Sequence, residues 1–76
     1  MGTMTADFGG DVALVTGAAG GMGRAIALAF ARAGATVVMG DVDEQGGRET
    51  ARLVGETGAP GVFVVTDVAD ALLLAR

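Results

Sequence analysis

A glycine-rich segment between a predicted strand and a predicted helix places the strongest constraint on how this chain can fold. Residues 16–23 read Thr-Gly-Ala-Ala-Gly-Gly-Met-Gly; they follow a run of strand-forming residues over 11–15 and precede a helical pattern over 24–33. Glycine adopts positive φ and lets the backbone approach a ligand closely. The helix behind the turn directs unpaired N–H groups and a partial positive charge towards it. Such a turn can bind a pyrophosphate without any basic side chain.

Apolar runs and helical patterns alternate along the rest of the chain. Strands are expected over 12–16, 36–40 and 62–66, a first helix over 24–33, and a second helix that begins at 43–44 and stops at the turn over 58–61. The strands are continuously apolar, which is typical of parallel strands buried on both faces. Short connections and right-handed crossovers then predict an α/β fold: a three-stranded parallel sheet in the order 3-2-1, which is half of a doubly wound sheet.

The helical patterns also predict which side chains face the sheet. On the first helix the buried stripe is expected at Ile26, Phe30 and Ala33, with Gly34 as the stop; on the second helix it is expected at Thr50, Ala51 and Val54. Two glycines in the second helix, Gly46 and Gly47, are expected to weaken it by roughly 1 kcal/mol each relative to alanine. Phe8 is expected to cover one end of the sheet, and Asp70 could cap a third helix of about a turn and a half.

Composition excludes several classes of function. A net charge of −4 argues against nucleic acid and against an anionic membrane as partners. The chain has no cysteine and no histidine, which excludes disulfides, thiolate metal sites, most other metal sites and the usual general base. No apolar run approaches the ~20 residues of a membrane span, and the N-terminus does not read as a signal peptide. We therefore expect a cytoplasmic protein with a disordered tail over 1–6.

Three features fall at the carboxyl ends of the three predicted strands, where open α/β sheets bind their ligands. The first is the glycine-rich turn. The second is Asp41, which stands eighteen positions after Gly23, close to the spacing of about 20 for an acid that binds a ribose diol. The third is Asp67 with Val68, which could line an adenine pocket. Each alone has an ordinary structural explanation, such as a turn or a helix cap; their order on consecutive strands favours a nucleotide site.

The turn resembles the Thr-Gly-x-x-x-Gly-x-Gly motif of short-chain dehydrogenases/reductases. The segment Gly10-Asp11-Val12-Ala13-Leu14-Val15 before it and the Asp-Val pairs after the second and third strands are similar to the same family. The resemblance covers roughly residues 7–70, so that 7–76 would be a partial Rossmann NAD-binding domain. The glycine spacing also fits the extended, epimerase-like branch, but a glycine at position 21 favours the shorter branch.

The resemblance implies a role for seven residues. The pyrophosphate would lie against the turn, the adenosine ribose against an acid and the adenine against the third strand end; in that order the residues are Gly17, Gly21, Met22 and Gly23, then Asp41, then Asp67 and Val68. The carboxylate of Asp41 would repel a 2′-phosphate, which predicts NAD in preference to NADP. Arg24 is the only arginine near the site, and we expect it to face away from the ligand, inside the helix.

The chain departs from the family in one respect that bears on activity. Family members use a Tyr with a Lys four residues later, plus a Ser and usually an Asn, and this chain contains none of these four residue types. We therefore expect an NAD(P)-binding fragment, inactive alone: the first half of an enzyme that transfers hydride between a nicotinamide cofactor and an alcohol or carbonyl substrate, shortened by its gene or by design. The open edge of the strand over 12–15 predicts self-association.

Two alternatives remain open at this point. The chain could be a stand-alone nucleotide-binding module that a partner chain completes. It could also be the start of an S-adenosylmethionine-dependent methyltransferase, which uses a glycine turn and an acid after its second strand. The threonine before Gly17 and the spacing to Gly21 argue against the methyltransferase.

Overall fold

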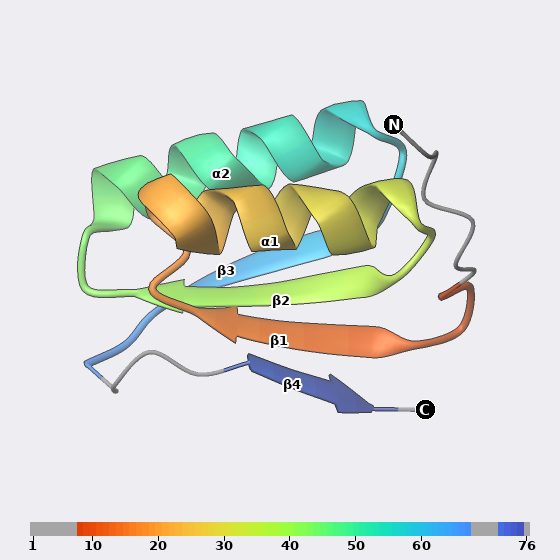
Figure 1. Cartoon of the computed structure of the whole chain (residues 1–76). Helices are drawn as coiled ribbons and strands as arrows, with labels where there is room; N and C mark the ends of the chain where they lie inside the picture. The colour runs from red at the N-terminus through yellow and green to blue at the C-terminus, as the bar shows by residue number, and fades with distance from the viewer. Residues whose placement is uncertain (1–7, 68–71, 76) are drawn as a thin grey trace.

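Strands and helices alternate along the chain as the sequence predicts (Figure 1). The computed structural model describes residues 8–67 and 72–75. The elements are β1 (Val12–Thr16), α1 (Gly21–Arg32), β2 (Thr36–Asp41), α2 (Glu44–Glu56), β3 (Gly61–Val65) and β4 (Leu72–Ala75). The tail expected over 1–6, together with Val68 and Asp70, lies outside the described residues.

The sheet has the order β3-β2-β1-β4. The pairs β1–β2 and β2–β3 are both parallel, with Val12 opposite Thr36 and Val37 opposite Gly61. The three-stranded parallel sheet with order 3-2-1 is therefore confirmed. Because the three strands are parallel and in register, their carboxyl ends lie at the same end of the sheet, where the glycine-rich turn also begins.

The last element is a strand, and the prediction of a third helix was wrong. Residues Leu72–Ala75 pair antiparallel with β1, with Leu72 opposite Val15 and Ala75 opposite Val12. A helix of a turn and a half is marginal by itself because its nucleus costs more than one turn repays. The vacant edge of β1 offers the same residues backbone hydrogen bonds along one side of an extended strand. The edge of β1 that we expected to be open is consequently covered by β4.

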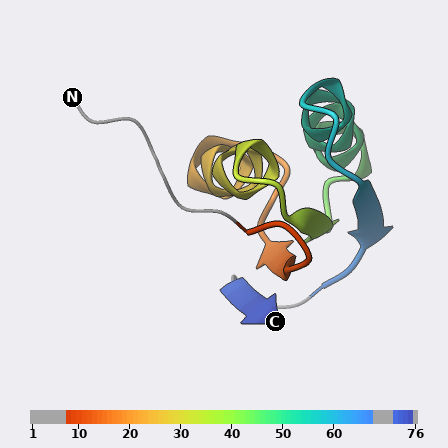
Figure 2. The same ribbon diagram turned by 90° about the vertical axis from the view of Figure 1, so that its right-hand side faces the viewer.

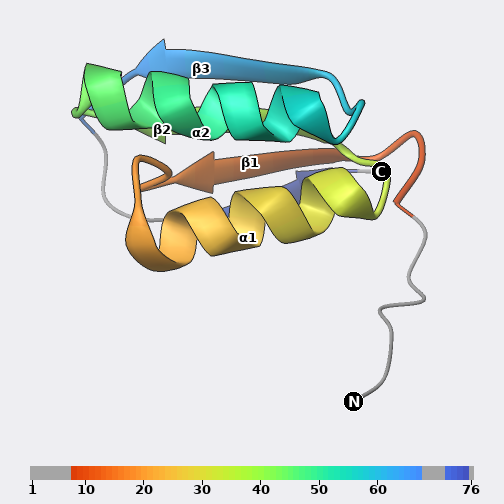
Figure 3. The same cartoon turned by 90° about the horizontal axis from the view of Figure 1, so that it is seen from above.

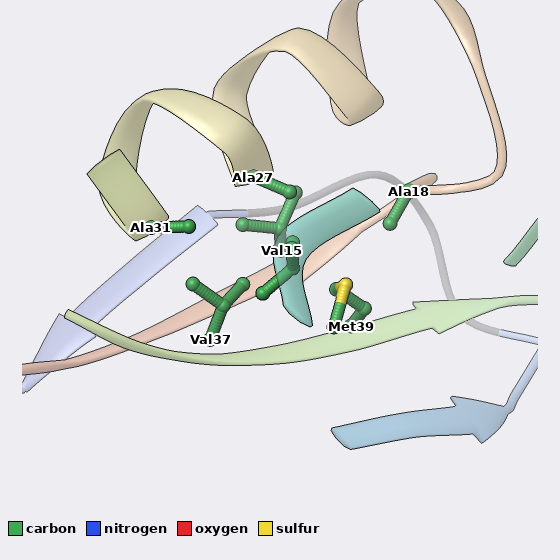
Figure 4. Close-up of a cluster of buried hydrophobic side chains, with 7 residues drawn as sticks. Val15, Ala18, Ala27, Ala31, Val37 and Met39 are labelled. Carbon is green, nitrogen blue, oxygen red and sulfur yellow. The ribbon is translucent and has the colours of Figure 1, made fainter. Parts of the chain in front are cut away.

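Both helices lie on the same face of the sheet (Figures 1 and 2), and they run side by side when viewed from above (Figure 3). The core fills the space between helices and sheet (Figure 4); its fully or almost fully buried members are Val15, Ala18, Ala27, Ala31, Val37, Met39 and Val54. The small side chains of Ala27 and Ala31 let α1 approach β1 and β2. Met39 of β2 is the largest fully buried side chain among the described residues, and its Cε lies near Gly61 at the start of β3.

The opposite face of the sheet is bare among the described residues, and this contradicts the prediction of strands buried on both faces. Side chains alternate between the two faces of a strand, and in β1 Ala13 and Val15 are buried while Val12 is 39% exposed. In β3, Val62 and Val64 are 54% and 50% exposed. A continuous apolar run marks strands whose second face needs cover, and the described part of this chain supplies cover for one face only.

The helix stripes were predicted in part. On α1 the most buried residues are Ala27 and Ala31, with Ile26 and Phe30 partly buried beside them. The stripe is therefore centred one position later than expected. On α2, Gly47, Thr50 and Val54 are buried and Ala51 is partly buried, so that the expected residues do face the core.

The ends of the helices contribute smaller contacts. Helix α1 stops at Arg32, and Gly34 follows with a φ of 98°, as its predicted role as a stop requires. Phe8 packs its ring on Phe30 of α1 at a centroid distance of 5.1 Å. Within the described residues, neither helix has the length and apolar character that a bilayer crossing demands.

Candidate functional site

The turn after β1 is built so that its backbone faces outwards at the start of α1. Gly21 has a φ of 57°, and a Cβ added there would meet nothing within 4 Å. Gly23 has the opposite requirement, because a Cβ there would lie 1.9 Å from the carbonyl oxygen of Gly17. One glycine therefore supplies a left-handed backbone beside open space, and the other lets the helix close against the turn.

The N-terminus of α1 has no side-chain cap. Gly20 occupies the cap position, makes no side-chain hydrogen bond to the helix, and the first turn contains no acidic residue. The first N–H groups of a helix have no partner within it, and the helix dipole adds a partial positive charge there. Met22, in the same turn, is 79% exposed. The first turn is therefore suited to an anion that approaches from solvent.

Asp41 ends β2 and lies against this turn. Its Oδ2 accepts the backbone N–H of Ala19 at 2.9 Å, and its Oδ1 accepts the N–H of Asp43 at 2.9 Å. Hydrogen bonds from the backbone N–H of Asp43 first, and then of Ala19, hold the pKa of Asp41 below its ordinary value. The carboxylate is thus ionised at neutral pH, and each oxygen retains capacity to accept a further hydrogen bond.

The turn is also held through its carbonyl groups. The backbone oxygen of Ala18 accepts the Thr50 hydroxyl at 2.6 Å, and that of Ala19 accepts Nη2 of Arg24 at 2.6 Å. Arg24 and Thr50 meet directly, with Nε donating to Oγ1 at 2.8 Å. We call these two side chains the Arg24–Thr50 bridge. Arg24 lies inside α1, and its guanidinium contacts both the turn and α2.

The Arg24–Thr50 bridge was not predicted from the sequence. Thr50 was assigned to the buried stripe of α2, which is correct, since it is fully buried. A buried hydroxyl needs polar partners, and Thr50 finds one in the turn because the N-terminal half of α2 packs against it. An arginine directly after the last glycine of the motif was the available signal.

The third strand end lies beside the second. The backbone N–H of Thr66 donates to the carbonyl of Asp41 at 3.0 Å, which places the residues after β3 next to the end of β2. Asp67 is exposed there. Val68, its predicted companion, lies outside the described residues. Of the seven predicted site residues, the turn glycines, Met22 and Asp41 are brought together, and Asp67 follows the neighbouring strand.

Two surface hollows lie elsewhere. One, of about 450 Å³, lies between the C-terminal halves of the helices and is lined by Leu28, Arg32, Leu53, Glu56 and Thr57. The other, of about 460 Å³, is lined by Arg48, Ala51, Arg52, Phe63 and Val65. Neither includes a residue of the turn. The uncapped start of α1 and the carboxylate of Asp41 therefore lie outside both hollows.

The sequence of this chain matches the family model described as short chain dehydrogenase over residues 11–74. The chain belongs to this family. The matched range includes both the glycine-rich turn and Asp41. The match does not favour a methyltransferase or a stand-alone nucleotide-binding module.

Individual short-chain dehydrogenases agree with the family match. The short chain dehydrogenase/reductase astE of Aspergillus oryzae is 52% identical over 60 residues, which are 78% of this chain and 23% of that protein. A short chain dehydrogenase from Mycobacterium paratuberculosis, bound to NAD, has a TM-score of 0.77 and 32% identity over 80% of this chain and 27% of its own. A metagenomic short-chain oxidoreductase in complex with NADP has a TM-score of 0.76 and 35% identity, over 79% of this chain and 27% of its own.

This chain thus spans about a quarter of the length of these short-chain dehydrogenases. The family uses nicotinamide cofactors, and the two solved relatives hold NAD and NADP respectively. The comparisons identify the family and its type of cofactor, while the choice between the two cofactors has to be argued from this chain's own residues.

Proposed function

We propose that this chain binds the adenosine and pyrophosphate part of a nicotinamide dinucleotide at the carboxyl ends of β1, β2 and β3. The pyrophosphate would lie at the start of α1, against the backbone of Gly17, Gly21, Met22 and Gly23. The ribose of the adenosine would donate hydrogen bonds to Asp41. The adenine would lie beside the residues after β3, Asp67 and Val68.

The observation that supports this proposal most strongly is the fit between the turn and a pyrophosphate. A helix start with no side-chain cap and no acidic residue attracts an anion, and Gly21 leaves open space beside the backbone. A side chain at Gly21 would occupy this open space and strain the backbone, whose φ is 57° there, and a Cβ at Gly23 would lie 1.9 Å from the carbonyl oxygen of Gly17. The residues present therefore suit a pyrophosphate bound through main-chain N–H groups.

We further propose that NAD is preferred to NADP because of Asp41. A 2′-phosphate would stand against an ionised carboxylate. Two like charges about 4 Å apart repel by about 1 kcal/mol in water and by about 4 kcal/mol at an effective dielectric constant near 20. Each ~1.4 kcal/mol is a factor of ten in affinity, so the preference would range from several-fold to some hundreds. Val42 and Asp43, which follow Asp41, offer the phosphate no cation.

The bound dinucleotide would supply hydride chemistry, transferring hydride to or from an alcohol or carbonyl substrate. This chain's own residues would bind and orient the cofactor. Tyr, Lys, Ser and Asn are the residue types that the resemblance assigns to proton transfer and substrate binding, and they do not occur in this sequence. We therefore propose that the chain is a cofactor-binding fragment, inactive by itself. The cytoplasmic location stays a prediction from sequence.

Binding of ADP-ribose and of S-adenosylmethionine to the purified chain tests the proposal, with titration followed by backbone amide shifts. ADP-ribose should bind and shift the amides of residues 19–23 and the signals of Asp41, whereas S-adenosylmethionine, which has no pyrophosphate, should not. Changing Gly21 to valine should abolish the ADP-ribose effect, because valine does not tolerate positive φ. Changing Gly55, which faces open space on α2, to alanine is the control. No shift with ADP-ribose in the folded chain would refute the proposal.

A further inference from the structure

The two halves of the turn are held very differently. All four backbone polar groups of Ala18 and Ala19 have partners. The N–H groups donate to Gly40 O at 3.2 Å and to Asp41 Oδ2 at 2.9 Å, and the carbonyl groups accept from the Arg24–Thr50 bridge at 2.6 Å each. Gly20 and Gly21, which follow directly, face open space. The half proposed to meet the ligand is therefore carried by a fixed half behind it.

The Arg24–Thr50 bridge also ties the turn to α2. Nη2 of Arg24 donates to the carbonyl oxygen of Gly46 at 3.1 Å as well as to that of Ala19. Helix α2 can come this close because residue 46 has no side chain; a Cβ there would lie 2.9 Å from the Ala19 oxygen. Arg24 thus gathers acceptors from the turn and from α2 at one guanidinium.

An arginine suits this place better than a lysine does. Nε and Nη2 lie on different positions of one planar group, and between them they reach a hydroxyl and two carbonyl oxygens. A planar fork with fixed donors loses less freedom per hydrogen bond than a flexible ammonium group. Arg24 is partly buried between the helices, so these bonds are shielded from competing water.

We propose that Arg24, acting through Thr50 and the carbonyl groups of Ala18 and Ala19, is a positioning residue for the pyrophosphate of the dinucleotide. This inference rests on the proposed function. A site made of backbone N–H groups binds tightly only when those groups are aligned before the ligand arrives, because ordering them on binding lowers affinity. The bridge fixes the segment that carries them, without touching the ligand.

The test compares ADP-ribose with adenosine in variants of the full chain. Arg24→Met keeps the length of the side chain and removes its donors; Thr50→Val keeps the shape and removes the hydroxyl; Thr50→Ser keeps the hydroxyl. Arg48→Met is the matched control, because Arg48 also carries one positive charge but is exposed on α2 and pairs with Glu44. Dissociation constants for both ligands are measured by amide-shift titration, and folding is checked by thermal unfolding.

Arg24→Met and Thr50→Val should weaken ADP-ribose binding by about tenfold or more, because each removes a hydrogen bond that involves a charged or fully buried group. Adenosine, which lacks the pyrophosphate, should change by less than about twofold. Thr50→Ser and Arg48→Met should stay close to the wild type. Amide hydrogen exchange at residues 19–23 should be faster in the two weakened variants.

Three results would overturn the positioning role: unchanged ADP-ribose affinity in folded Arg24→Met, equal weakening of both ligands, or an equal effect of Arg48→Met. If Arg24→Met does not fold, the pair Thr50→Val and Thr50→Ser decides the matter, since the proposal requires them to differ. Failure of the proposed function is distinguishable, because the wild-type chain would then bind ADP-ribose no better than adenosine.

Discussion

The carboxylate of Asp41, at the end of β2, accepts the backbone N–H of Ala19, in the turn after β1, at 2.9 Å. The residue proposed to select the cofactor is therefore also one of the supports of the turn proposed to bind the pyrophosphate. Its second oxygen accepts the N–H of Asp43, whose own side chain caps α2 through Gly46. Substitutions at Asp41 should act on selectivity and on the geometry of the turn together.

Two substitutions should separate these roles. Asp41→Asn removes the charge but keeps an oxygen that can accept an N–H, so it should narrow the preference for NAD over NADP with little loss of NAD affinity. Asp41→Ala removes both acceptors, so it should weaken NAD binding by about tenfold. NADP binding should weaken by less, because NADP also escapes the repulsion from the carboxylate, and the preference for NAD should therefore narrow. Calorimetric titration with NAD and NADP measures this. An unchanged NAD to NADP ratio in both variants would show that Asp41 does not choose the cofactor.

Asp41 should also make the stability of the chain depend on pH. Its pKa is lowered in the folded state, so its stabilising contribution is fully present above the unfolded value of about 3.9 and is lost as the pH falls through the lower folded value. The difference in unfolding free energy between wild type and Asp41→Asn should therefore shrink below about pH 4. Urea unfolding at several pH values measures it. A constant difference across that range would contradict the assigned hydrogen bonds.

A negative charge at the start of α1 should raise stability and lower affinity. Met22 is 79% exposed in a first turn that has no acidic residue, so Met22→Asp loses little packing and should stabilise the helix by about 0.3–1 kcal/mol. The same charge would repel a pyrophosphate, and NAD affinity should fall several-fold. Met22→Gln serves as the uncharged control. Thermal unfolding and NAD titration together test this, and a variant that gains stability with full affinity would place the pyrophosphate elsewhere.

Gly47 should be costly to replace even though it lies inside a helix. Intrinsic propensity predicts that alanine there stabilises α2 by about 1 kcal/mol. A Cβ at this position would, however, lie 2.0 Å from a ring atom of Phe63 on β3, and overpacking of this kind costs about 1–3 kcal/mol. Gly47→Ala should therefore be destabilising, whereas Gly55→Ala, on the same helix but beside open space, should be neutral or stabilising. Equal effects in chemical unfolding would mean that the ring moves aside without cost.

Self-association should arise from the bare face of the sheet rather than from the edge of β1. That edge is paired with β4, and Val62 and Val64 are half exposed on the face away from the helices. Exposed apolar patches promote association. Replacing both valines with threonine keeps the β propensity and should shift the chain towards monomer in sedimentation velocity. Association that is unaffected by the double substitution would point to an edge strand instead.

The charged side chains on the surface of α2 pair with neighbours in the sequence. Glu44 with Arg48, and Arg52 with Glu49 and Glu56, form ion pairs at helical spacing, as three- and four-residue separations allow. Hydrogen bonds and charge from Glu49 stabilise the cation of Arg52. These side chains are decided by neighbours in the sequence, and they lie away from the turn.

The order of strands and helices, the parallel arrangement of β1, β2 and β3, and the residues that follow these strands could all be predicted from the amino-acid sequence. Apolar runs, helical periodicity and glycine spacing are local properties, and short crossovers leave one arrangement for them. The contacts of Arg24 and Thr50 with the turn, the position of Gly47 against the ring of Phe63 and the pairing of residues 72–75 with β1 could not be predicted in this way. Each of these depends on contacts between segments far apart in the sequence, and no local pattern reports which buried hydroxyl or vacant strand edge will find a partner.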